Sequence, residues 1–195
     1  MKLHQIFIDV GKGHTFRDVP MYSDFYDNNK KYYSIKVWSE EDLDTLMLNY
    51  PEFIDMYNSF PHKWYKMDFC KTFILHSEGG FYMDMDNEIL DFFDFDCDYL
   101  VSNWLNEVAS DLIYFRNRDE YIKYARFMKD RYYKCKMPTT WVTRRLQYSV
   151  AQKCFNQYCK LNRISPITDL PFKRYCSQMW LKVFNKKKIE IIKNS

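Results

Sequence analysis

A helical pattern that ends at two consecutive glycines, followed at once by a strand pattern, is the feature that most constrains the fold of this chain. Residues 62–77 carry apolar side chains at helical spacing. Gly79 is a suitable end for this helix, because glycine readily adopts the left-handed conformation just past a helix. Residues 81–86 then read Phe-Tyr-Met-Asp-Met-Asp. The pattern therefore predicts a long helix, a tight Gly-Gly turn and an acidic strand.

The acidic strand carries the strongest chemical signal. Successive side chains of a strand point to opposite faces, so Tyr82, Asp84 and Asp86 are expected on one face. Carboxylate oxygens are ligands for hard cations such as Mg²⁺ and Mn²⁺. We therefore predict that Asp84 and Asp86 bind a divalent cation, which could in turn bind the diphosphate of a sugar nucleotide. The alternative is that they are solvated acids at a strand end.

The rest of the chain alternates between strand and helix patterns. Ser39 followed by Asp42 resembles a capping box, which supports a helix start at residue 40. Such alternation predicts an α/β fold, with a mostly parallel sheet flanked by helices and ligands bound at the carboxyl ends of its strands. Strands are expected over 2–8, 34–38, 97–102 and 111–115, and helices over 20–31, 40–49, a short stretch from Pro51, 118–134 and 139–160, before a loop-rich end.

Composition and charge exclude several classes of protein. The chain has 195 residues, 47% of them hydrophobic, which suits one domain and argues against disorder. A net charge of +3 is too balanced for a typical nucleic-acid-binding protein. Residues 84–98 contain several acids and no Lys or Arg, and we interpret residues 91–98 as a solvated edge. The basic residues 186–188 are interpreted as a solvated end, with peripheral contact to an anionic membrane as the alternative.

The cysteines and the N-terminal residues bear on the cellular compartment. None of the six cysteines forms a Cys-x-x-Cys pair, so free thiols are expected rather than a zinc site. No apolar run reaches the roughly 18 residues of a transmembrane helix. Residues 1–8 read as a strand and lack the features of a signal peptide. We therefore expect a cytoplasmic protein without a transmembrane segment.

Four segments, in order, carry a resemblance to a known family. They are His4-Gln5-Ile6-Phe7-Ile8, Val37-Trp38, Asp68-Phe69-Cys70-Lys71 and Gly79-Gly80-Phe81-Tyr82-Met83-Asp84-Met85-Asp86. The sequence resembles glycosyltransferases that have a sugar-binding region containing a DXD motif. This family includes initiating α-1,6-mannosyltransferases and is distantly similar to the glucosyltransferase domains of clostridial toxins. The resemblance implies a single Rossmann-like GT-A-type domain over residues 1–195, and the short chain is compatible with one domain of a longer polypeptide.

The resemblance also implies roles for individual residues. Asp86 and Asp84 would bind Mn²⁺ or Mg²⁺, and together with Lys71 they would form the catalytic set. Lys71 stands where the family has arginine, so it keeps the charge but loses the planar fork. The donor-binding residues implied by the resemblance are Phe7 and Ile8 through their backbone, and Trp38, Asp68, Lys71, Tyr82 and Asp84 through their side chains.

Each of these side chains also has a purely structural interpretation. Asp68 and Lys71 are three residues apart, as in an ordinary helix ion pair. Trp38 could be a core residue instead of stacking on the donor base, and Tyr82 a half-buried strand residue. Four further positions are weaker candidates: Asn103 and Asp111 for the acceptor, and Ser177 and Trp180 for the diphosphate.

The function predicted from the sequence is a metal-dependent glycosyltransferase, a hexosyl- or deoxyhexosyltransferase of the DXD type. It would move a sugar from a UDP- or GDP-sugar to a hydroxyl of a glycan or glycoprotein. Two alternatives stay open at this point. One is a non-catalytic module that binds nucleotide sugars or glycans, and the other is a metal-dependent nucleotidyltransferase, which would need further acids for a second metal.

Overall fold

A five-stranded sheet forms the centre of the structure. The computed structural model describes residues 1–9, 13–60, 63–93, 95–104, 107–134, 150–166 and 171–174. The sheet has the order β2-β1-β3-β6-β5. Strands β1 and β2 and strands β1 and β3 pair in parallel, whereas β6 is antiparallel to both β3 and β5. Four of the five strands therefore run in one direction, which confirms the predicted α/β fold class. The strands are β1 Lys2–Ile6, β2 Ser34–Trp38, β3 Phe81–Met83, β5 Tyr99–Trp104 and β6 Glu107–Phe115.

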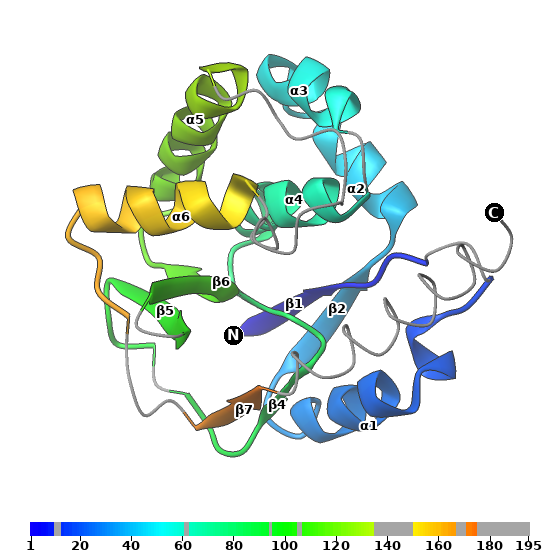
Figure 1. Ribbon diagram of the computed structural model, residues 1–195. Coiled ribbons are helices and arrows are strands. Elements are labelled where there is room, and N and C mark those ends of the chain that lie inside the picture. Colours follow the sequence, from blue (N-terminus) through cyan, green and yellow to red (C-terminus); the bar gives the residue numbers. More distant parts are fainter. Residues whose placement is uncertain are drawn as a thin grey trace, which may run out of the picture.

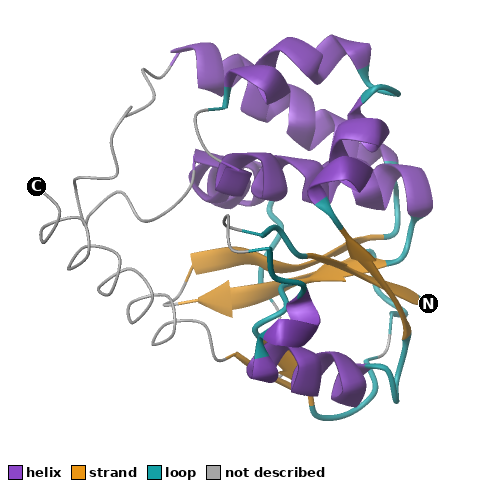
Figure 2. Ribbon diagram, turned by 90° about the vertical axis from the view of Figure 1, so that its right-hand side faces the viewer, coloured by secondary structure: helices purple, strands orange, loops and turns teal. Residues whose placement is uncertain are grey.

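Helices cover both faces of this sheet. Figures 1 and 2 show α2 to α6 on one side and α1, with a small two-stranded ribbon of β4 and β7, on the other. None of the helices in the described ranges is both long and apolar enough to cross a membrane. The helices are α1 Pro20–Asn29, α2 Glu40–Met47, α3 Ile54–Ser59, α4 Lys63–Glu78, α5 Asp119–Lys134 and α6 Val150–Leu161; 3₁₀ turns lie at Phe16–Asp18 and Pro51–Phe53, and the ribbon strands are β4 Asn87–Ile89 and β7 Phe172–Arg174.

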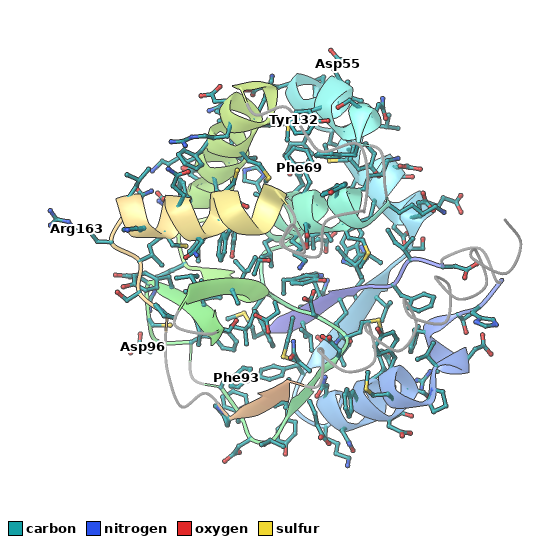
Figure 3. All side chains as sticks on the ribbon, in the orientation of Figure 1. Asp55, Phe69, Phe93, Asp96, Tyr132 and Arg163 are labelled. Carbon is teal, nitrogen blue, oxygen red and sulfur yellow. The ribbon has the colours of Figure 1, made fainter. Side chains whose placement is uncertain are left out.

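Strand alternation creates two hydrophobic cores, one on each side of the sheet. Tyr82 points to the side covered by α2 to α6, whereas Phe81 and Met83 point to the side of α1. Figure 3 shows Phe69 of α4 among the helices on the first side and Phe93 on the second. This agrees with the alternation expected for the start of the acidic strand.

The two glycines after α4 serve different purposes. Both have positive φ, +70° at Gly79 and +76° at Gly80, so both favour a residue without a side chain. A Cβ at Gly80 would also lie 2.3 Å from the backbone oxygen of Lys2. Gly80 therefore lets β3 start close beside β1, while Gly79 ends the helix.

The acidic strand is shorter than predicted, and this is a correction. β3 ends at Met83, and the chain then turns, with the Asn87 amide donating to the Asp84 carbonyl at 3.2 Å. Asp84 and Asp86 are therefore in a turn, where the simple alternation of a strand no longer applies. β4 and β7 are not among the predicted strands, because a three-residue strand carries too little pattern to be recognised.

The remaining elements were predicted with shifted ends. β6 begins four residues before the predicted strand, and α6 begins at Val150, whereas residues 139–149 of its predicted helix are outside the described residues. Asp96 and Asp98 are exposed beside Arg116, as expected for a solvated edge. Cys70, Cys154 and Cys159 are buried and Cys97 is partly exposed, and these four form no disulfide, whereas Cys135 and Cys176 are outside the described residues.

Candidate active site

The carboxyl ends of three parallel strands meet at one edge of the sheet. β1, β2 and β3 end at Ile6, Trp38 and Met83, and the registers of the two pairs place these ends side by side. The Phe7 amide continues the ladder by donating to the Trp38 carbonyl at 3.0 Å. Asp84 directly follows β3 at the same edge. In open α/β sheets such an edge is where ligands bind.

Lys71 is the centre of the polar network behind this edge. It projects from α4, and its side chain is only 4% exposed. Its ammonium lies 2.9 Å from Asp68 Oδ1 and 3.0 Å from Asp84 Oδ1, and it donates to the Ser110 carbonyl at 3.2 Å. Burial opposes the charge on this lysine, but the two carboxylates outweigh that effect and raise its pKa. Lys71 is therefore a charged residue that joins α4 to the turn after β3 and to β6.

Asp84 receives a second hydrogen bond on the oxygen that Lys71 contacts. The Tyr82 hydroxyl donates to Asp84 Oδ1 at 2.8 Å, and the Tyr82 side chain has no exposed surface. The Asp84 side chain is 33% exposed. Burial in the protein and the nearby Asp111 raise the pKa of Asp84, and Lys71 opposes this shift. Lys71 and Tyr82 thus hold one carboxylate oxygen of Asp84 inside the protein, while a third of its side chain is open to solvent.

Asp86 is buried, in contrast to the solvated strand-end acid that was its structural alternative. It is 7% exposed. Burial, followed by the charges of Asp84 and Asp111, raises the pKa of Asp86 to about 7. Carboxylates that repel one another in this way form a site that favours a cation.

Asp111 is closer to this acidic pair than the sequence indicated. It is on β6, and its carbonyl accepts a hydrogen bond from the Asp84 amide at 2.8 Å. Its carboxylate accepts hydrogen bonds from Ser102 Oγ and, at 3.5 Å, from Asn87 Nδ2. The carboxylate is therefore held within the protein beside the DXD turn. The sequence suggested only an acceptor contact for Asp111 and gave no role to Ser102 or Asn87. Ser102 reaches Asp111 through the pairing of β5 with β6, and Asn87 is at the start of β4, after the turn.

Trp38 is a core residue in this structure. It is 3% exposed, and its indole Nε1 donates to His4 Nδ1 at 3.1 Å. Its ring also contacts Lys36, whose ammonium is 3.6 Å from the ring centroid. Stacking of Trp38 on a donor base stays a prediction, and this geometry supports its structural alternative.

Several predicted site residues do not join this cluster. Phe7 is partly exposed at the strand edge, and its ring packs edge-on against Phe16 and Tyr22. Ile8 is buried. Ser177 and Trp180 lie outside the described residues, and so does the side chain of Asn103. Their predicted roles stay predictions.

The described residues do not by themselves complete a metal coordination sphere. Within these ranges no group of three or more His, Cys, Asp and Glu side chains is arranged to hold a metal ion. The oxygen donors of Asp84 and Asp86 nevertheless suit Mg²⁺ or Mn²⁺, which often bind through one or two carboxylates together with water and substrate phosphates. The donor set therefore fits a divalent cation whose remaining ligands come from water or a bound phosphate.

Comparison with known proteins gives similarities of three kinds. Residues 17–95 match the sequence model of the family described as glycosyltransferase sugar-binding region containing DXD motif. A stretch of 55 residues is 33% identical to inositol phosphoceramide mannosyltransferase 3 of Schizosaccharomyces pombe; it is 28% of this chain and spans only 15% of the length of that relative.

The third similarity is one of fold. The solved structure of the PaToxG glycosyltransferase superposes with a TM-score of 0.52 and 14% sequence identity, over 83% of this chain and 68% of that one. The match to the family model includes the Gly-Gly turn, Asp84 and Asp86. The resemblance predicted from the sequence is thus confirmed: residues 17–95 are similar to the DXD-containing sugar-binding region of that glycosyltransferase family, and the fold is similar to that of a glycosyltransferase.

Proposed function

We propose that this protein is a metal-dependent glycosyltransferase that transfers a sugar from a UDP- or GDP-sugar to a hydroxyl of a glycan or glycoconjugate. The observation that carries the proposal is the position of Asp84 and Asp86, in a turn at the carboxyl edge of the parallel strands. These are the acids of the motif shared with the family. The finer features of the proposal are the donor, the metal and the acceptor.

The acids of the turn have the properties that metal-dependent donor binding requires. Asp84 is partly open to solvent, and Asp86 is a buried carboxylate next to other acids. A bound Mn²⁺ or Mg²⁺ would supply Lewis-acid stabilisation of the departing diphosphate. Within the protein, Asp84 and Asp86 would hold that ion, while Asp68 and the backbone of Phe7 and Ile8 would orient the donor. The hexosyl or deoxyhexosyl nature of the sugar and the cytoplasmic location remain predictions from the sequence.

The test is a panel of UDP- and GDP-sugars incubated with the protein and Mn²⁺ or Mg²⁺. Because the fission-yeast relative is named as a mannosyltransferase, mannosyl donors come first. Release of free UDP or GDP that depends on the metal supports the proposal. Binding without turnover would instead indicate a non-catalytic module. In a parallel incubation with UTP or GTP and a sugar 1-phosphate, release of pyrophosphate would indicate a nucleotidyltransferase.

A matched pair of variants shows whether the activity belongs to this site. Asp86→Ala is expected to abolish metal-dependent release of the nucleotide. Asp96→Ala removes an acid from a second Asp-x-Asp sequence, at an exposed position paired with Arg116, and is expected to keep activity within about twofold of wild type. Full activity of the Asp86 variant would contradict the assignment of the site.

A further inference from the structure

We infer that Lys71 and Tyr82 are positioning residues that fix Asp84 Oδ1 and leave Asp84 Oδ2 as the oxygen presented to the metal and donor. The inference rests on the proposed function and deepens it. It replaces the direct donor contact that the sequence suggested for these two residues with a role exerted through Asp84.

The donor hydrogens of Lys71 are all used inside the protein. A lysine ammonium has three N–H donors. Three acceptors lie around this one: Asp68 Oδ1, Asp84 Oδ1 and the Ser110 carbonyl, at 2.9, 3.0 and 3.2 Å. The side chain is buried. A contact with a bound sugar or phosphate would require Lys71 to give up one of these partners.

Tyr82 reaches the same carboxylate oxygen from the strand. Its hydroxyl donates to Asp84 Oδ1, and Lys71 Nζ lies 4.8 Å from the centroid of its ring. Because Tyr82 is fully buried, no part of it is available to a ligand in this arrangement. The hydroxyl and the ammonium therefore hold one atom of Asp84 from two directions.

The consequence for Asp84 is a fixed orientation. Hydrogen bonds to an ionised acceptor are stronger than neutral ones, so two of them on Oδ1 strongly restrict rotation of the carboxylate. No hydrogen bond from a described residue to Oδ2 is present, and a third of the side chain is exposed. Asp111 and Asp68 lie close enough to repel Asp84, which would favour other orientations if Lys71 and Tyr82 were absent.

Lysine suits this role better than the arginine of the family. Three donors on one compact nitrogen match three acceptors that converge from α4, the turn after β3, and β6. The planar fork of arginine is suited instead to two parallel bonds to one carboxylate or phosphate. Replacing Lys71 would leave buried carboxylates unpaired and risks unfolding the protein, so Tyr82 offers the sharper test.

The experiment compares Tyr82→Phe with the matched control Tyr57→Phe. Tyr57 is also buried, and its hydroxyl donates to a carboxylate, Asp44 Oδ1 at 2.6 Å, on the helical side of the molecule. Affinities for UDP and for GDP are measured by calorimetry with Mn²⁺ and, separately, with EDTA. Tyr82→Phe is expected to weaken Mn²⁺-dependent binding by about 3- to 10-fold and to change binding in EDTA by less than about twofold, because only the orientation of Asp84 is lost. Tyr57→Phe is expected to leave both affinities within about twofold of wild type.

Two results would overturn the inference. Equal losses with Mn²⁺ and with EDTA would mean that Tyr82 contacts the nucleotide directly. Unchanged affinities, with only a loss of stability like that of Tyr57→Phe, would mean that Tyr82 is merely structural.

A second measurement separates this inference from the proposed function. In a double-mutant cycle, Tyr82→Phe and Asp84→Asn are combined and the folding equilibrium is measured by urea unfolding. If the wild type binds neither nucleotide with Mn²⁺, the proposed function fails, and the cycle decides the positioning role. Coupling between the two changes of about threefold or more in the folding equilibrium constant supports the positioning role, whereas additive effects overturn it.

Discussion

Asp86, the proposed metal ligand, is expected to oppose the stability of the fold. Its carboxylate is almost fully buried beside Asp84 and Asp111, and this raises its pKa to about 7. Burial without a paired cation disfavours the ionised form. A group that destabilises the metal-free protein but suits a cation is more readily explained by ligand binding than by folding.

We therefore predict that Asp86→Asn stabilises the metal-free protein. Because the folded-state pKa is raised, the carboxyl contributes most favourably below pH 4, and this contribution is lost as the pH rises through about 7. The variant should exceed the wild type by about 2 kcal/mol in unfolding free energy at pH 8, and by much less at pH 4. Urea unfolding in EDTA measures this difference. A variant that is less stable than wild type at pH 8 would show that Asp86 is a structural acid.

At the scale of elements, the turn between α4 and β3 joins the helix that carries Lys71 to the strand that leads into Asp84. Gly79 and Gly80 both have positive φ, but their surroundings differ. The nearest atoms to a Cβ at Gly79 belong to the Arg118 guanidinium, at 3.9 Å, and the Arg118 Nε also donates to the His76 carbonyl at 2.8 Å. The nearest atom to a Cβ at Gly80 is the backbone oxygen of Lys2, on β1. The turn therefore fixes both the end of the helix and the contact between β1 and β3.

This difference gives a paired prediction. Gly79→Ala is expected to cost about 1 kcal/mol, the cost of a positive φ for alanine. Gly80→Ala is expected to cost about 3 kcal/mol or more, because the clash with Lys2 O adds to the same backbone cost. Thermal or urea unfolding of the two variants measures the difference. Equal losses would show that the turn does not limit the approach of β3 to β1.

At the scale of the whole molecule, β1, an inner strand of the sheet, contains a buried histidine that links pH to global stability. His4 has no exposed surface and accepts a hydrogen bond from Trp38 on the neighbouring strand. Burial, together with the charge of Lys2, lowers the pKa of His4 to about 4. The folded protein thus keeps His4 neutral where an unfolded chain would take up a proton.

We predict that His4 reduces stability in acid. Its favourable contribution is complete above pH 6.5 and is lost as the pH falls to about 4, at a cost of about 3 kcal/mol. Urea unfolding of wild type and His4→Asn at pH 7 and pH 4.5 isolates this group, because other groups contribute equally to both proteins. The variant should lose less stability between the two pH values. Parallel pH profiles would contradict a neutral, buried His4.

How much of the site could be predicted depends on the distance along the chain between the residues that meet. The Asp68–Lys71 contact follows from helical spacing, and the place of Asp84 at a strand edge follows from the Gly-Gly turn and the start of β3. By contrast, the proximity of Asp111 to Asp84 depends on the register of β3 with β6, which joins segments far apart in the sequence. No local pattern encodes that register.

The sequence by itself determined the types of most elements, the mostly parallel sheet and the residues of the DXD signature. These depend on side-chain periodicity and on the backbone freedom of glycine, which act within a few residues. Only the tertiary structure decided that Asp86 is buried, that Lys71 is enclosed by three acceptors and that the Tyr82 hydroxyl donates a hydrogen bond to Asp84. Burial and charge pairing arise when α4, β3 and β6 pack together, so the electrostatic character of the site is a property of the folded molecule.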